Sequence, residues 1–145
     1  GRARRRGRER PVSAVLVDSN VLLDILLPDP EWEAWSTETL ARTADRSPLV
    51  INPIIYGEVS IGFRDVETLE AALQPAFRRE SIPWDAAFLA GKSFVTYRRR
   101  GGVRRAPLPD FFIGAHAAVR GHRLLTRDAR RYRVYFPTVE LIAPS

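Results

Sequence analysis

Cysteine and methionine are both absent from this sequence of 145 residues, and histidine occurs only twice. The lack of cysteine excludes a disulfide framework, a thiolate zinc site and a cysteine nucleophile. The two histidines, His116 and His122, leave little room for histidine-based metal chemistry. Because methionine is absent, we do not expect Gly1 to be the natural start of the chain.

Long apolar runs are missing as well. The longest stretch without a charged residue is Ser47–Gly57, which has eleven residues. A helix needs about 18 apolar residues to span a bilayer, so no membrane segment is expected. The apolar region that follows the basic N-terminal residues is interrupted by acids, which argues against a signal peptide. We therefore expect a cytoplasmic protein.

Positive charge is concentrated at one end of the chain. The formal net charge is +6, but residues 1–10 contain six arginines and one glutamate, which leaves +1 for the other 135 residues. A basic excess suggests an anionic partner such as nucleic acid. We expect residues 1–11 to form a flexible Arg-rich arm. Residues 12–145 are then one folded domain, large enough to bury a core without disulfides or a structural metal.

Short apolar strands alternate with helices along the rest of the chain. The predicted strands cover residues 12–17, 49–51, 81–83, 123–126 and 139–142. The predicted helices cover residues 21–27, 30–44, 53–63, 66–77, 85–99 and 108–120, with a helical turn at 128–132. This alternation predicts βαβ crossovers, and hence an α/β fold with a mostly parallel sheet and helices on both sides. In such sheets ligands bind beyond the carboxyl ends of the strands.

Four acidic side chains occupy positions that this fold would direct toward one crevice. Asp18 and Asp128 each follow a predicted strand at its carboxyl end, and Asp110 lies at the start of an almost wholly apolar helix. Glu58 lies on the apolar face of its helix, with isoleucines at i−4, i−3 and i+3. A carboxylate on such a face costs desolvation free energy unless a positive charge meets it.

Each of these acids also has a purely structural interpretation. Asp18, Asp110 and Asp128 are suitable helix N-caps, and Glu58 could pair with a buried arginine. We interpret Asp24 as a solvated residue or as a support for the other acids. Four converging carboxylates, however, repel one another unless a multivalent cation neutralises them. A site of oxygen donors alone favours Mg²⁺ or Mn²⁺, which activate water for attack on a phosphodiester.

Polar and basic side chains near the acids are candidates for binding a substrate: Ser19, Asn20, Arg104, Arg105 and Thr126. The hydroxyl and amide groups are suited to orienting water or substrate. The two arginines precede Asp110 by five and six residues, and positive charge beside an acidic metal site suits a polyanion. His116, on the same apolar helix as Asp110, is interpreted as a hydrogen-bonded core residue rather than a base.

Four segments contain the acids and their neighbours. They are V-L-V-D-S-N-V-L-L-D, N-P-I-I-Y-G-E-V, L-P-D-F-F-I-G-A-H-A and L-L-T-R-D-A-R-R-Y-R-V-Y-F-P-T-V-E-L-I. Together they span nearly all of residues 12–142, and in order and spacing they resemble the PIN-domain ribonucleases, specifically the VapC-type toxins of type II toxin–antitoxin systems. The Arg-rich arm is not part of this family pattern.

The resemblance implies a three-layer α/β/α sandwich in which Asp18, Glu58, Asp110 and Asp128 form the metal site. It implies Mg²⁺- or Mn²⁺-dependent endonucleolytic cleavage of RNA by a metal-activated water. It also implies a homodimer that is neutralised by a cognate VapB-type antitoxin. Two other functions remain open from the residues themselves: a non-catalytic module that binds nucleic acid or protein, and a metal-dependent DNA nuclease or phosphatase.

Overall fold

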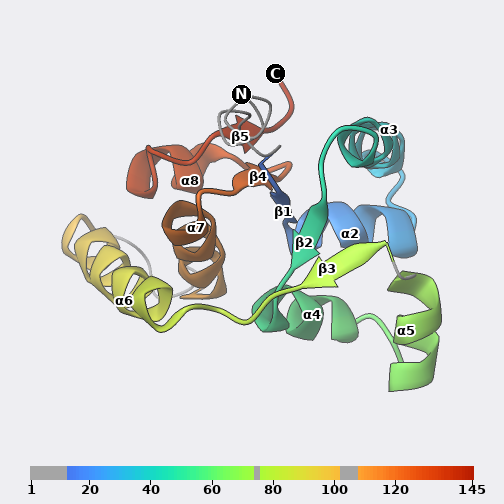
Figure 1. Ribbon diagram of the computed structural model, residues 1–145, viewed down its shortest axis with the longest axis horizontal. Helices are drawn as coiled ribbons and strands as arrows, with labels where there is room; N and C mark the ends of the chain where they lie inside the picture. Colours follow the sequence, from blue (N-terminus) through green and yellow to red (C-terminus); the bar gives the residue numbers. More distant parts are fainter. Residues whose placement is uncertain (1–12, 74–75, 102–107) are drawn as a thin grey trace, which may run out of the picture.

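A computed structural model of the chain describes residues 13–73, 76–101 and 108–145 (Figure 1). Within these residues, five short strands form one sheet: β1 (Val15–Val17), β2 (Leu49–Ile51), β3 (Phe77–Arg79), β4 (Arg123–Leu125) and β5 (Leu141–Ile142). The strands are hydrogen-bonded in the order β3-β2-β1-β4-β5, and every pair is parallel. The predicted parallel sheet is therefore confirmed.

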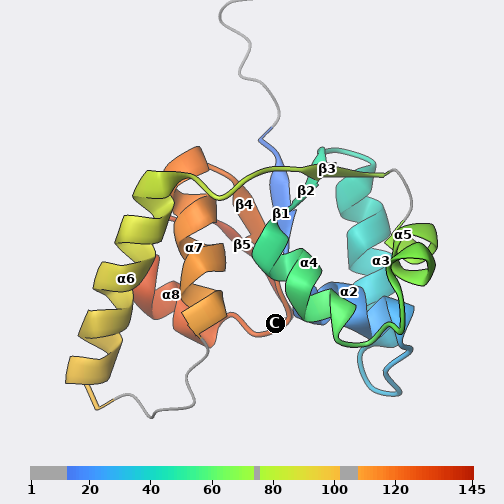
Figure 2. The same cartoon turned by 90° about the horizontal axis from the view of Figure 1, so that it is seen from below.

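The helices of the described residues lie on both sides of this sheet. They are α2 (Ser19–Leu26), α3 (Glu33–Ala44), α4 (Pro53–Ser60), α5 (Val66–Leu73), α6 (Trp84–Arg99), α7 (Leu108–Arg120) and α8 (Arg130–Tyr135). Figures 1 and 2 show α2, α3 and α5 on one side and α6, α7 and α8 on the other. Helix α4 packs against both α2 and α7. The predicted α/β fold with three layers is thus confirmed.

Burial on both faces explains why the central strands are uniformly apolar. All residues of β1 and β2 are buried, as expected for strands of a parallel sheet that is covered by helices on each side. Helix α7 adds Phe111 and Ile113 to the core. Gly114, on the same helix, lies so close to the ring of Phe136 that a Cβ would collide with it. This close approach fixes α7 against the end of α8.

The third strand differs from its prediction. It covers Phe77–Arg79 rather than residues 81–83, and α5 ends at Leu73 rather than at residue 77. This strand lies at the edge of the sheet, and Arg78 and Arg79 are exposed, so it lacks the apolar run that reveals a buried strand.

The start of α3 also differs, because the helix begins at Glu33 instead of residue 30. Asp29 Oδ1 accepts hydrogen bonds from the backbone N–H groups of Glu31 and Trp32, both at 2.9 Å. The aspartate therefore forms a side-chain turn ahead of the helix.

Two predicted features lie outside the described residues: the Arg-rich arm at residues 1–11, and the pair Arg104 and Arg105. Among the helices of the described part of the chain, none has the length and apolar character needed to cross a membrane.

Candidate active site

The predicted acids gather at the carboxyl-terminal edge of the sheet. Asp18 directly follows β1, Glu58 comes from α4, and Asp110 lies in the first turn of α7. Burial and the negative charges of Asp18 and Glu58 raise the pKa of Asp110 to about 7, although Arg131 opposes this shift. The three carboxylates therefore lie within electrostatic range of one another.

The capping interpretation of the aspartates does not hold in the structure. Asp18 occupies the N-cap position of α2, but its side chain makes no capping hydrogen bond. Asp110 lies inside the first turn of α7 instead of preceding it, and the N-cap of α8 is Ala129 rather than Asp128. Among the described residues no arginine pairs with Glu58, which accepts a hydrogen bond from Ser19 Oγ at 2.7 Å.

Asp18 is a buried carboxylate whose partners are neutral hydroxyls. The residue is 3% exposed, and its Oδ2 accepts hydrogen bonds from Thr126 Oγ1 at 2.8 Å and Tyr132 Oη at 3.0 Å. Its Oδ1 has a long contact of 3.4 Å from Ser19 Oγ. Burial raises the pKa of Asp18, and within the described chain no lysine or arginine pairs with it. A buried carboxylate without a cationic partner is costly, so Asp18 is suited to hold a cation.

Asp110 is the acid with a cationic partner. Arg131 Nη1, on α8, donates a hydrogen bond to Asp110 Oδ2 at 2.6 Å. Even with this partner, the pKa of about 7 leaves Asp110 close to half protonated at neutral pH. An acid whose pKa is raised this far by burial and like charges is typical of a functional site. One arginine is thus insufficient to balance the three acids.

The predicted polar residues are tied to the acids by hydrogen bonds. Asn20 Nδ2 donates to Thr126 Oγ1 at 3.3 Å, and Asn20 Oδ1 accepts from the backbone N–H of Arg127 at 3.3 Å. Thr126 is fully buried, so its hydroxyl orients Asp18 from inside the protein. With Ser19 bound to Glu58, helix α2 is connected to α4 and to the loop after β4.

Asp128 stands apart from the other three acids. The residue is exposed, and its carboxylate makes no hydrogen bond or ion pair with the described residues. Its backbone N–H donates to Thr126 Oγ1 at 3.1 Å, which holds the loop near Asp18. In the described part of the chain, no three of the predicted acids place ligand oxygens within 4.8 Å of one another. The four acids thus share one edge of the sheet without a tight cluster.

Asp24 is not the solvated residue that the sequence suggests. It is only 2% exposed, because α3 covers this face of α2. Its Oδ2 accepts hydrogen bonds from Ser36 Oγ and Arg127 Nε, each at 2.8 Å. The solvated interpretation is therefore wrong, and Asp24 instead anchors Arg127 in the loop that carries Asp128.

Arg131 and Tyr132 are site residues that sequence reasoning did not assign to the acids. Both lie in the helical turn predicted at residues 128–132, so the sequence places them close to Asp128 along the chain. Which side chains of the segment R-R-Y-R face inward depends on how α8 packs on the sheet. Tyr132 is buried and Arg131 half-buried, whereas Arg130 and Arg133 are exposed.

The donor set fits a hard divalent cation. All four acids offer oxygen donors, and the three that interact carry more negative charge than Arg131 can balance. Mg²⁺ and Mn²⁺ prefer carboxylate oxygens over nitrogen or sulfur donors. The chemistry of the side chains therefore agrees with the metal that the sequence predicts.

Comparison with known proteins identifies the fold. The crystal structure of VapBC2 from Rickettsia felis, bound to a DNA fragment from its promoter, matches with a TM-score of 0.70 and 15% identity, over 91% of this chain and 99% of that chain. DNA-bound VapBC from Salmonella typhimurium matches with a TM-score of 0.67 and 18% identity, over 90% of this chain and 98% of that chain. VapC20 from Mycobacterium tuberculosis, described as a sarcin-ricin loop cleaving toxin, matches with a TM-score of 0.65 and 15% identity, over 88% of this chain and 99% of that chain.

A family model gives the decisive match. No curated protein sequence matches the chain significantly. The model of the PIN domain, however, matches residues 15–137, a range that includes all four predicted acids. Because this match covers most of the chain, and the fold agrees with it, the protein belongs to the PIN-domain family.

Proposed function

We propose that this protein is a VapC-type toxin, an endoribonuclease that depends on Mg²⁺ or Mn²⁺ and is neutralised by a VapB-type antitoxin. The observation that carries the proposal is the group of three interacting carboxylates, Asp18, Glu58 and Asp110, for which the described residues supply one cationic partner, Arg131. Membership of the PIN-domain family, whose fold is that of nucleases, supports it. So does the similarity of the fold to VapBC complexes and to VapC20.

Asp18, Glu58, Asp110 and Asp128 are the residues that would hold the cation. When bound, such a cation activates water and stabilises the charge that develops on a phosphodiester under attack. Thr126 and Tyr132 orient Asp18 through its Oδ2 and leave Oδ1 available. These bonds keep a buried carboxylate in one orientation before any substrate arrives, so little reorganisation is needed.

Four other side chains complete the proposed machinery. Ser19 fixes Glu58 through the 2.7 Å hydrogen bond, and Arg131 holds Asp110. The guanidinium of Arg131 is half-buried next to the acids, where its charge also suits a phosphate group. Arg104 and Arg105, in the segment that leads to Asp110, are proposed to contact the RNA backbone, as positive charge beside the site favours a polyanion.

The proposed partners follow from the same comparisons. Two of the similar structures are toxin–antitoxin complexes that are bound to DNA. We extend this to a VapB-type antitoxin whose segment covers the acidic site, and to a homodimer of the toxin. Trp84 and Phe88 on α6 are exposed by 92% and 69%, and large apolar side chains of this kind are suited to a protein interface.

A panel of substrates tests the proposed activity directly. The full chain is incubated with Mn²⁺ and, in turn, single-stranded RNA, structured RNA, DNA and a phosphomonoester. We expect strand scission of RNA that stops when a chelator removes the metal. Release of phosphate without scission, or scission of DNA in preference to RNA, would reject the ribonuclease proposal in favour of a phosphatase or a DNA nuclease.

Replacing Tyr132 by phenylalanine tests the positioning of Asp18. The change deletes one of the two hydroxyl donors to Oδ2, a hydrogen bond that lowers the pKa of Asp18. The pKa therefore rises further, and we expect the affinity for Mn²⁺ at pH 7 to fall roughly tenfold, as is usual when a partner of a metal ligand is lost. Isothermal titration calorimetry measures the affinity. Tyr56→Phe is the matched control: it deletes a tyrosine hydroxyl that donates to Glu70 at 2.8 Å, a carboxylate outside the acidic site, and it should bind Mn²⁺ as the wild type does.

A further inference from the structure

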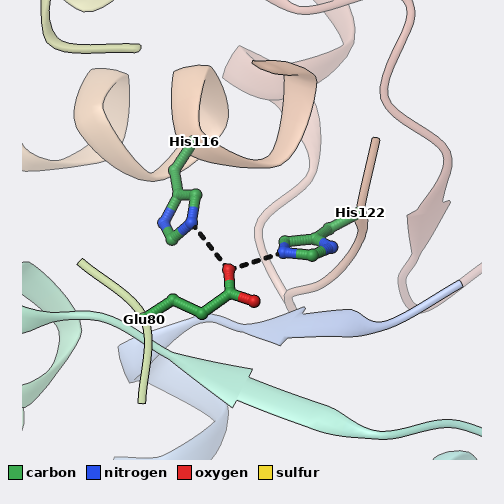
Figure 3. Close-up of side chains that lie close together, drawn as sticks. All are labelled: Glu80, His116 and His122. Carbon is green, nitrogen blue, oxygen red and sulfur yellow. Dashed lines mark hydrogen bonds and ion pairs between the residues drawn. The ribbon is translucent and has the colours of Figure 1, made fainter. Parts of the chain in front are cut away.

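Both histidines of the chain meet on one carboxylate outside the acidic site (Figure 3). His116 Nε2 lies 3.1 Å, and His122 Nε2 2.8 Å, from Oε1 of Glu80. The three residues come from separate segments, since Glu80 follows β3, His116 lies on α7, and His122 precedes β4. His116 is fully buried and hydrogen-bonded, which confirms its interpretation as a core residue.

The distances from Glu80 Oε1 to the two imidazole nitrogens are near those between ligands of a filled metal site. In tetrahedral coordination with metal–ligand bonds of about 2.0–2.1 Å, neighbouring ligand atoms lie about 3.3 Å apart. Among the described residues, this is the one group in which three histidine or carboxylate ligand atoms lie within 4.8 Å of one another. The side chains of His116 and His122 are 0% and 10% exposed, and that of Glu80 is 32% exposed. Two of the ligands are thus held by packing.

We propose that Glu80, His116 and His122 form a second metal site, which binds Zn²⁺ or a similar transition-metal ion such as Co²⁺. Imidazole nitrogen selects these ions over Mg²⁺, so this site and the acidic site would take different metals. Two histidines and one glutamate are a donor set that binds Zn²⁺ and leaves a fourth position open. Glu80 also lines a surface cavity of about 280 Å³, which gives an ion a route to the carboxylate.

Asn52 decides which nitrogen of His116 carries the proton. Asn52 Oδ1 accepts from the backbone N–H of Ile55 at 2.9 Å, and Asn52 Nδ2 lies 2.9 Å from His116 Nδ1. In this arrangement Nδ2 donates to Nδ1, so His116 carries its proton on Nε2 and donates it to Glu80. An ion at Nε2 requires the other tautomer, with the proton on Nδ1.

The Asn52 amide then has to turn so that Oδ1 accepts from Nδ1, and the hydrogen bond that caps α4 is lost. Losing such a cap weakens the affinity for the ion about fivefold. Asparagine therefore weakens the site, whereas an aspartate at this position could accept from the His116 Nδ1–H and from the Ile55 N–H at once. The affinity for the ion is expected to depend on this single side chain.

The test is a titration of the full chain with Zn²⁺ alone, in competition with a chromophoric chelator. It uses the Asp110→Asn variant as background, which weakens the acidic site. We expect one equivalent of Zn²⁺ to bind. His122→Gln and Glu80→Gln should each weaken binding by more than about 100-fold, because losing even an outer partner of a ligand costs about 10–100-fold. Asn52→Asp should strengthen binding about tenfold.

Two control measurements distinguish loss of the metal site from loss of the fold. Thermal unfolding without metal shows whether His122→Gln and Glu80→Gln remain folded, and Co²⁺ gives visible absorption bands of tetrahedral coordination that each variant should lose. Absence of saturable Zn²⁺ binding would overturn the proposal, as would an affinity that is unchanged in His122→Gln and Glu80→Gln. Weaker binding by Asn52→Asp would contradict the role of the tautomer. The outcome does not depend on nuclease activity, so it is separate from the proposed function.

Discussion

Asp110→Asn is expected to abolish metal-dependent RNA cleavage, with a loss in kcat/KM of at least about 1,000-fold, or about 4 kcal/mol of transition-state stabilisation. The substitution keeps the size of the side chain but removes one of the negative charges that would hold the cation. Asp18, Glu58 and Asp128 would remain, so weak metal binding at high concentration is compatible with this result. A quantitative cleavage assay over a range of Mn²⁺ concentrations measures the loss.

The matched control is Asp85→Asn. Asp85 also lies in the first turn of its helix, but it is exposed and outside the acidic site. This variant should cleave RNA at the wild-type rate. If Asp110→Asn kept the activity of Asp85→Asn at every Mn²⁺ concentration, Asp110 would have no part in catalysis.

The same substitution should stabilise the folded protein at pH 7, although it lowers the activity. The folded, metal-free protein holds a proton on Asp110 up to a pKa of about 7, whereas the unfolded chain releases it near the ordinary value of 3.8. Between these values the folded state binds more protons than the unfolded state, so the free energy of unfolding falls as the pH rises. At about 1.4 kcal/mol for each pKa unit, this loss is on the order of 4 kcal/mol. The raised pKa of Asp18 acts in the same direction.

Urea unfolding between pH 4 and pH 8, with a chelator present, measures this dependence. Asp110→Asn should flatten the pH profile and unfold at a higher urea concentration than the wild type at pH 7. The lowered pKa values of Glu80 and His116 act in the opposite direction in both proteins, so the difference between the two profiles reports Asp110 together with its repulsion of Asp18 and Glu58. Adding Mn²⁺ should raise the free energy of unfolding of the wild type at pH 7, because the ion binds the ionised carboxylates of the folded protein. Identical pH profiles for the wild type and Asp110→Asn would show that the pKa of Asp110 is not raised in the folded protein.

Buried elements with continuous apolar patterns were predictable from the sequence. Strand β2 and helix α7 have the predicted bounds, because nearly every residue that identifies them faces the core. The edge strand β3 was misplaced because two of its three residues are exposed arginines. The bounds of a segment can be predicted from its local sequence only where most of its residues are buried and therefore apolar.

Part of the site was predictable for a similar reason. Parallel strands end at a common edge, so Asp18 and Thr126 were expected at the same edge once their strands were recognised, and the pairing of β1 with β4 makes them neighbours. The hydrogen-bond partners of these groups were not predictable in this way. Tyr132, for example, donates to Asp18 although the two residues are 114 positions apart in the sequence. The cluster at Glu80 joins residues that are 36 and 42 positions apart, and no spacing rule connects them. Such contacts depend on how the layers pack.

The most direct test of the central claim is a map of RNA 5′ ends in cells after induction of the wild type or of Asp110→Asn, without an antitoxin. The account predicts new ends at a limited set of RNA sites with the wild type, and their absence with Asp110→Asn at equal protein levels. The same new ends in both samples, or none in either, would contradict the claim that these acids form the centre of a ribonuclease.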